Sequence, residues 1–317
     1  MKSIKEIIGD ARTVAISGHI RPDGDCVGSC MAIYNYIRDN FPNVEANVYL
    51  EYVDKKFEII KNVDKIITTG YDGTKVDLCF AMDSADLERL GSNRGFFENA
   101  ERTACIDHHI SNKGFADYNY ILPDASSACE TLYDLLDEEL ISKETAEALY
   151  LGIAHDSGGF RYSNTSPKTL NIAASMIAKG VNIVDILEDT FYMKTFEQQK
   201  ITGMVLSNLE KYLDDKCVYG YVTFEMMKAA NVTTNELGHV ISEMRNVEGT
   251  ECAIFMYQTG DNSYKVSLRS NKYVDVSRIA VNFGGGGHIR AAGFDATGTR
   301  EEIFNRVLAE IQEQLET

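Results

Sequence analysis

Long apolar runs and an excess of positive charge are both missing from the sequence. No apolar run is as long as a membrane helix, which needs about 18 residues, and no signal-peptide pattern is present. We therefore expect a soluble chain without a membrane span. The 31 Lys and Arg are outnumbered by 48 Asp and Glu, which gives a net charge of −17. Because non-specific nucleic-acid binding depends on neutralising phosphates, this charge argues against long duplex partners. A small phosphate ligand remains compatible with it where metal ions reverse the local charge.

Cysteine is sparse and lacks the spacing of a metal site. The seven cysteines are scattered and none forms a C-x-x-C pair. Most lie in apolar strings such as "DLCFAMD" and "TACID", which is typical of small buried thiols in a reducing cytoplasm. Cys26 and Cys30 are four residues apart, but no other soft ligand lies near them in the sequence, which argues against zinc. We therefore expect a cytoplasmic location.

Internal repeats and low-complexity linkers are also absent, and 317 residues are natural for two domains. In the first half, apolar runs with strand character alternate with helical patterns. This alternation predicts an α/β domain with a parallel sheet and helices on both faces. Strands are expected at 12–18, 44–50, 75–83 and 102–107, and helices after the first strand and at about 126–139 and 143–155.

The pattern changes in the second half of the chain. A long helical stretch, roughly 167–213, follows Pro167. Its residues before Gly180 are expected to form the last helix of the first domain, and its later part a helical connector. After Asp215, strand and helix patterns predict a second, smaller α/β domain with a mixed sheet. Its strands are expected at 217–224, 251–258 and 263–270, and its helices at about 233–244, at 275–282 and at the C-terminus. The expected segments are a first domain over 1–188, a helical connector over 189–213 and a second domain over 214–317.

Four acidic clusters lie where predicted strands or an apolar helix end. Ligands bind beyond the carboxyl ends of parallel strands, so we expect the clusters to converge on one rim. Carboxylates and imidazoles without a thiolate suit manganese, magnesium or iron better than structural zinc. The six candidate metal ligands are His19, Asp23, Asp25, Asp83, His108 and Asp156.

Each carboxylate by itself has a simpler interpretation as a helix cap or turn residue. Asp25, for example, is a candidate cap for a helix that starts at Cys26. The four clusters together favour a metal site instead. One central carboxylate would bridge two ions about 3.5–4 Å apart, the spacing typical of two-metal phosphoryl-transfer sites.

A glycine cluster, "FGGGGHIRAAGF" at 283–294, is the other strong feature. Its backbone N–H groups are open to an anion, but no Lys-Ser/Thr follows, so it is not a P-loop. A flexible turn before a strand is the alternative, yet ordering four glycines loses much chain entropy, which favours a function. Arg269, at the end of a predicted strand, is a candidate phosphate clamp, and a solvated surface Arg is an equal alternative.

Five motifs occur in order: "GHIRPDGDCVGS", "MDSAD", "DHH", "HDSGGFRY" and "GGGGHIRAAGF". Together they resemble the DHH phosphoesterase superfamily with its DHH-associated C-terminal domain. The resemblance covers nearly the whole chain. Within the superfamily, the sequence is most similar to the bacterial oligoribonuclease/pAp phosphatase group. The string DHH alone is weakly specific, whereas five motifs in the correct order are highly specific.

The resemblance implies a catalytic first domain with two divalent ions, manganese or alternatively magnesium. The first ion would be held by His19, Asp23 and Asp83. The second would be held by Asp25, Asp83, His108 and Asp156, with Asp83 as the bridge. The catalytic residues implied are Asp83, Asp107 and His109, of which His109 would face the substrate phosphate and Asp107 would orient His108.

The same resemblance implies that the second domain binds the nucleotide. The residues that would do so are Arg269, Gly285, Gly286, Gly287 and His288. One position departs from the family pattern, because His155 stands where relatives commonly have Thr before the last ligand, Asp156. Two interpretations of His155 stay open, a spectator on the helix or an outer partner of the metal ligands.

The implied activity is hydrolysis of short RNA of about two to five nucleotides, or of 3′-phosphoadenosine 5′-phosphate, by a metal-activated water. A phosphodiesterase for pApA or cyclic di-AMP would use the same site. An inorganic pyrophosphatase is less favoured, because the glycine loop suits a nucleotide. A catalytically silent nucleotide sensor is the alternative of a different class, and the complete ligand set argues against it. Relatives often form dimers, so a homodimer is a further expectation.

Overall fold

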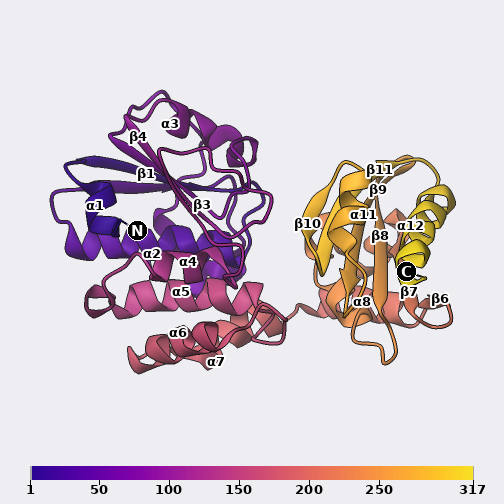
Figure 1. Cartoon of the computed structure of the whole chain (residues 1–317). Coiled ribbons are helices and arrows are strands. Elements are labelled where there is room, and N and C mark those ends of the chain that lie inside the picture. The colour runs from indigo at the N-terminus through magenta and orange to yellow at the C-terminus, as the bar shows by residue number, and fades with distance from the viewer. Residues whose placement is uncertain (1, 317) are drawn as a thin grey trace. The chain divides into compact units, whose positions relative to one another are not determined.

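The structure is a computed structural model that describes residues 2–316. The chain forms two compact units, Met1–Met193 and Lys194–Thr317, which are described separately below (Figure 1). The first unit runs from indigo to rose in the figure, and the second from rose to yellow. Within the described residues, no helix is long and apolar enough to cross a membrane. The seven cysteines are buried and none is in a disulfide.

A five-stranded parallel sheet forms the centre of the first unit. Its order is β2-β1-β3-β4-β5, and every neighbouring pair is parallel. The strands are β1 (Thr13–Gly18), β2 (Glu45–Tyr49), β3 (Leu78–Met82), β4 (Arg102–Asp107) and β5 (Tyr118–Ile121). The three central strands are β1, β3 and β4, so the residues that follow them meet at one edge of the sheet.

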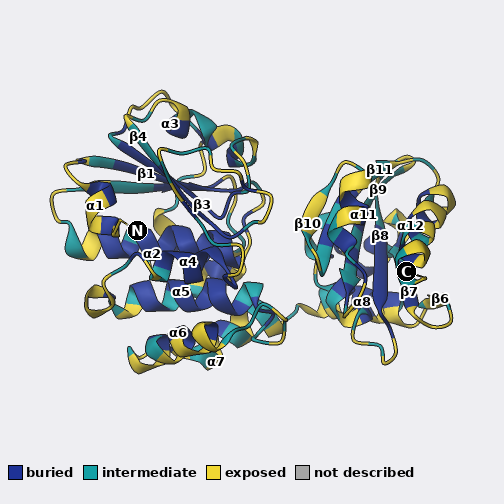
Figure 2. Cartoon of the chain, in the orientation of Figure 1, coloured by how far each residue is buried: buried dark blue, intermediate teal, exposed yellow. Residues whose placement is uncertain are grey.

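Helices cover both faces of this sheet, as predicted. One face packs on α2 (Gly24–Asn40), α4 (Ala128–Tyr133) and α5 (Lys143–Asp156), which are largely buried (Figure 2). The other face packs on α3 (Arg94–Glu98) through Phe96 and Phe97. The unit also contains α1 (Ile4–Ile8), α6 (Pro167–Ala178), α7 (Ile183–Leu187) and a π-helical turn at Glu188–Tyr192.

Two glycines let α2 and α5 approach closely. A Cβ on Gly28 would lie 2.6 Å from the carbonyl oxygen of Ala148 and 2.9 Å from the nitrogen of Gly152. A Cβ on Gly152 would lie 2.4 Å from Asp25 Oδ1. Only glycine fits at these two positions, and the close contact brings the end of α5 beside the start of α2.

The stretch after Pro167 is not one long helix. Gly180 has a φ of 91°, and Asn182 and Thr195 each cap a new helix, so α6, α7 and α8 (Phe196–Leu206) are separate. The limit between the compact units lies at Met193–Lys194. A connector role for residues 189–213 stays a prediction.

The second unit has a six-stranded mixed sheet, as expected. Its order is β10-β11-β9-β8-β7-β6, and only β7 and β8 are parallel. The strands are β6 (Glu210–Tyr212), β7 (Cys217–Val222), β8 (Cys252–Gly260), β9 (Ser263–Ser270), β10 (Gly286–His288) and β11 (Ala291–Thr297). One face packs on α11 (Val276–Asn282) and α12 (Arg300–Leu315), and the other on α8, α9 (Phe224–Ala230) and α10 (Val240–Met244).

Candidate metal centre

The predicted ligands gather at the carboxyl edge of the parallel sheet. His19 follows β1, Asp83 follows β3 and His108 follows β4, while Asp25 lies in the first turn of α2 and Asp156 ends α5. Four of these five residues are almost fully buried, and Asp156 is partly exposed. A set of buried carboxylates and imidazoles at this edge confirms the predicted convergence on one rim.

His19 is oriented by its own loop. Its Nδ1 lies 2.8 Å from the carbonyl oxygen of Ile20, which fixes the ring and directs Nε2 toward the acidic cluster. Nε2 lies 3.4 Å from Asp83 Oδ2 and 3.7 Å from Asp23 Oδ1. A carbonyl partner on one ring nitrogen is the usual support of a metal-binding imidazole.

The two carboxylates of the "DGD" turn are held in different ways. Asp23 is the N-cap of α2, and its Oδ1 accepts from the backbone N–H groups of Asp25 and Cys26 at 3.1 Å. The interpretation of Asp25 as the cap is therefore wrong, because the helix begins at Gly24. The carboxylate of Asp25 instead contacts the N-terminus of α4. It accepts hydrogen bonds from the backbone N–H groups of Ala128 at 2.6 Å and Cys129 at 3.0 Å.

Asp83 lies at the centre of the cluster and has a positive φ of 48°. Its Oδ1 is buried and has no hydrogen-bond partner within residues 2–316. The nearest imidazole nitrogens, His108 Nε2 and His109 Nδ1, are both 3.7 Å away. A buried carboxylate oxygen needs a partner, and a cation between these groups would satisfy it. The residues present therefore fit divalent metal ions.

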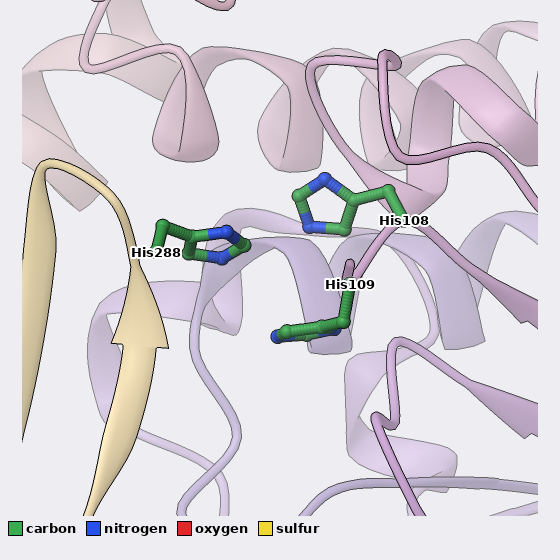
Figure 3. A group of neighbouring side chains, drawn as sticks. All are labelled: His108, His109 and His288. Atoms are coloured by element: carbon green, nitrogen blue, oxygen red, sulfur yellow. The ribbon is translucent and has the colours of Figure 1, made fainter. Parts of the chain in front are cut away.

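His108 and His109 have different partners. His108 Nδ1 lies 3.3 Å from the carbonyl oxygen of Ala125, and its Nε2 lies 3.0 Å from Asp156 Oδ2 and 3.9 Å from Asp25 Oδ2. His109 Nδ1 lies 2.7 Å from Asp107 Oδ1. Figure 3 shows the two rings, whose planes are 61° apart with centroids at 5.1 Å. The prediction that Asp107 orients His108 is therefore wrong, since Asp107 holds His109.

Asn112 completes this support and was not identified from the sequence. It is buried, and its amide donates to Asp107 Oδ2 at 2.7 Å. Its position five residues after Asp107 carries no recognisable pattern. The sequence argued against a zinc site at Cys26 and Cys30, yet the Cys26 thiol lies within 4.8 Å of ligand atoms of His19 and Asp83.

The crowding of charges shifts the pKa values of the cluster. Burial lowers the pKa of His108, but its contact with Asp156 and the charges of Asp25 and Asp83 raise it well above its ordinary value. Burial raises the pKa of Asp25, and the charges of Asp83 and Asp156 raise it further. Burial also raises the pKa of Asp156 to about 6 despite His108. The cluster therefore holds protons that a bound cation would displace.

The ligand atoms form overlapping groups around Asp83. One group is Asp25, Asp83 and His108, and another is His19, Cys26 and Asp83. The atoms in each group lie within 4.8 Å of one another. Two groups that share one carboxylate can hold two cations side by side.

In the second unit, the predicted nucleotide-binding residues lie on one hairpin and its neighbour. Arg269 on β9 pairs with Ala291 on β11, which pairs with His288 on β10. Directly paired residues project from the same face, so Arg269 and His288 share a face of the sheet. Figure 3 also labels His288, which ends β10.

The glycines of this hairpin have different structural roles. Gly287 has a φ of 143°, and a Cβ there would lie 2.4 Å from the carbonyl oxygen of Ala291. A Cβ on Gly285 would lie 2.3 Å from the carbonyl oxygen of Gly293. Gly286 is exposed, and a Cβ there would have no heavy atom within 4 Å. The first two are required by the hairpin itself, whereas Gly286 is free of packing constraints.

A parallel sheet with a carboxylate–imidazole centre, joined to a mixed-sheet unit with a glycine-rich hairpin, defines a two-unit α/β metal-binding protein. The model of the DHH family N-terminal domain matches residues 13–153, and that of the DHHA1 domain matches residues 214–317. The first unit therefore contains a DHH family domain, and the second unit is a DHHA1 domain.

Curated relatives are similar over nearly the full length. The chain is 28% identical over 311 residues to a "Bifunctional oligoribonuclease and PAP phosphatase NrnA" of Thermus thermophilus, covering 95% of this chain and 90% of that protein. It is 24% identical over 306 residues to the protein of the same name in Bacillus subtilis, covering 95% and 94%. A solved structure, an exopolyphosphatase-related protein from Bacteroides fragilis, has the same fold with a TM-score of 0.87 at 24% identity, covering 98% and 94% of the two chains.

Proposed function

We propose that this chain is a phosphoesterase that hydrolyses short oligoribonucleotides, about two to five nucleotides long, and 3′-phosphoadenosine 5′-phosphate with two divalent ions. The observation that carries the proposal is the pair of ligand groups sharing Asp83 at the carboxyl edge of the sheet. The names of the relatives support the substrate class. A net charge of −17 favours a small substrate over a long duplex.

Six residues would hold the ions. The proposed ligands of the first are His19, Asp23 and Asp83, and those of the second are Asp25, Asp83, His108 and Asp156. Oxygen and imidazole donors suit manganese, with magnesium as the alternative. When bound, the ions would supply a water of lowered pKa and compensate charge on the phosphoryl oxygens.

His109 is the proposed catalytic residue that contacts the phosphate. Asp107 accepts from its Nδ1 and is itself held by Asn112, so the ring has one orientation. Burial lowers the pKa of His109, but the bond to Asp107 and the charge of Asp83 raise it above its ordinary value. A cationic imidazole that is already oriented stabilises negative charge developing on a phosphoryl oxygen.

The second unit would bind the rest of the nucleotide. Arg269 and His288 offer cationic and imidazole donors from one face of the sheet, and the exposed Gly286 has no side chain that would keep an anion away from its backbone. Glycines 285 and 287 keep the hairpin in the shape that presents these groups. A homodimer and a cytoplasmic location remain predictions that accompany this function.

Hydrolysis assays with Mn²⁺ test the proposal directly. The purified chain is incubated with a diribonucleotide, 3′-phosphoadenosine 5′-phosphate, pApA and cyclic di-AMP, and compared with Asp83→Asn. We expect turnover of the first two substrates and a loss of at least about 10²-fold in the variant, because the shared ligand is removed. Asp64→Asn is a matched control, since Asp64 is an exposed carboxylate paired with Lys65.

The outcomes separate the candidate functions. Fastest turnover of pApA or cyclic di-AMP would replace the proposed substrates with a dinucleotide. Tight nucleotide binding without turnover under saturating Mn²⁺ would instead identify a sensor. Wild-type activity in Asp83→Asn would refute the metal-bridge assignment.

A further inference from the structure

His155 connects the metal centre to the last elements of the first unit. It precedes Asp156 at the end of α5, and its Nε2 lies 2.9 Å from the hydroxyl of Thr190. That hydroxyl donates to the carbonyl oxygen of Ile186 at 2.6 Å. Because the hydroxyl proton is used there, the imidazole donates its Nε2–H to Thr190. This bond fixes both the tautomer and the orientation of the ring.

The ring also packs against the turn that carries two proposed ligands. A Cβ on Gly24 would lie 2.2 Å from His155 Cγ and 2.4 Å from its Nδ1, so the imidazole touches the backbone between Asp23 and Asp25. Phe57 and Phe191 flank the ring edge-on, with centroids at 5.6 Å and 5.5 Å. The ring is therefore held on several sides.

The segment that holds His155 is itself unusual. Thr190 is buried within the π-helical turn Glu188–Tyr192, which follows α7 and ends one residue before the limit of the unit. Single π-helical turns are rare and often lie at functional sites. The turn places the Thr190 hydroxyl and the Phe191 ring on the same imidazole.

Asp23 is the proposed ligand that most needs such support. Its side chain is 59% exposed, whereas those of Asp25 and Asp83 are at most 3% exposed. Its position depends on the backbone of the turn at Gly24, against which His155 packs. Groups that orient metal ligands from outside commonly change metal affinity by about 10- to 100-fold when removed.

We propose that His155 is a positioning residue which, held by Thr190, keeps the Asp23–Asp25 turn and Asp156 in the arrangement that binds divalent ions. Metal affinity thereby depends on a contact with the segment that leaves the first unit. The inference rests on the proposed function for its metal centre and goes beyond it in assigning His155 and Thr190.

Binding of Mn²⁺ to the full chain, followed by the electron paramagnetic resonance signal of the free ion, tests this without substrate. Thr190→Val removes the acceptor with little change of volume, and we expect it to weaken Mn²⁺ binding by about five- to tenfold. Thr190→Ser keeps the hydroxyl and is expected to stay within about twofold of wild type.

The second unit offers a matched control. Thr202 on α8 makes the same pair of bonds, from its hydroxyl to the carbonyl oxygen of Gln198 at 2.8 Å and to His239 Nε2 at 2.7 Å. Thr202→Val is expected to leave Mn²⁺ affinity within about twofold of wild type, because it removes an equivalent bond in the other unit. His155→Gln, whose amide reaches toward Thr190, is expected to retain more affinity than the shorter His155→Asn.

Three results would overturn the inference. They are wild-type affinity in Thr190→Val, equal weakening in Thr190→Val and Thr202→Val, and equal weakening in Thr190→Val and Thr190→Ser. Failure of the proposed function would give a different result. The wild type would then hydrolyse none of the substrates, while its Mn²⁺ affinity would still depend on Thr190 as predicted.

Discussion

His19 Nε2 lies 3.4 Å from Asp83 Oδ2, which joins the end of β1 to the end of β3. The two strands are neighbours in the parallel sheet, with Gly18 paired to Met82, so the residues that follow them face the same space. Asp83 Oδ1 is also buried and has no hydrogen-bond partner within the described residues, so the side chains at this edge of the sheet are positioned to bind cations.

Metal binding is predicted to strengthen as the pH rises. The pKa of Asp156 is raised to about 6 and that of His108 well above its ordinary value, so both hold protons in acid that a cation must displace. We expect Mn²⁺ to raise the melting temperature more at pH 8 than at pH 5.5, measured by differential scanning fluorimetry.

The metal-free protein is predicted to show the opposite trend. Groups whose pKa is raised by folding bind more protons in the folded state, so stability falls as the pH rises through the raised values. The contribution of Asp156 to stability is lost as the pH rises from its ordinary pKa near 4 to its raised pKa of about 6. The contribution of His108 is lost at higher pH, because its pKa is raised well above the ordinary value. A melting temperature that rises from pH 5 to pH 8 in the presence of a chelator would contradict this account of the cluster.

Gly28→Ala is predicted to weaken both the fold and the metal centre. The new Cβ would lie 2.6 Å from the carbonyl oxygen of Ala148, so α2 and α5 must separate. Overpacking of this kind destabilises by about 1–3 kcal/mol, and it would move Asp25 away from Asp156. Urea unfolding and Mn²⁺ binding measure the two effects.

Gly203→Ala is the matched control, because Gly203 also lies within a helix and a Cβ there would meet nothing within 4 Å. It is expected to stabilise the protein by about 0.5–1 kcal/mol. If both substitutions had the same effect, the close approach of α2 and α5 would not explain the role of Gly28.

Gly286→Ala separates the binding role of the glycine hairpin from its structural role. Because Gly286 is exposed and unpacked, we expect an unchanged melting temperature and a KM for a diribonucleotide raised several-fold with little change in kcat. Gly287→Ala, which would press a Cβ to 2.4 Å from the carbonyl oxygen of Ala291, is expected to lower the melting temperature as well. An unchanged KM in Gly286→Ala would show that its backbone does not approach the substrate.

The fold and the edge that carries the site could be predicted from the sequence. Continuous apolar runs such as "DLCFAMD" mark buried parallel strands, and their acidic ends mark the carboxyl edge. The short strand β5 was missed, because only Tyr120 of its four residues is buried and the strand carries no apolar run. The end of α6 near Gly180 was predicted, whereas the break between α7 and α8 was missed.

The partners of individual side chains could not be predicted. Asp23 rather than Asp25 caps α2, because Asp25 finds two N–H donors on α4, more than a hundred residues away in the sequence. Asp107 holds His109 rather than His108, since His108 already contacts the carbonyl of Ala125. Such choices depend on the packing of distant elements, which no local spacing encodes.

Counting the Mn²⁺ ions that each chain binds, with and without the Asp83 carboxylate, is the most direct test of the central claim. Equilibrium dialysis of the full chain against Mn²⁺ at pH 8, followed by metal analysis, gives this number for the wild type and for Asp83→Asn. The account predicts two ions for each wild-type chain and at most one in the variant, because Asp83 is the shared ligand. A wild-type chain that binds no Mn²⁺, or a variant that binds two ions as tightly as the wild type, would contradict it.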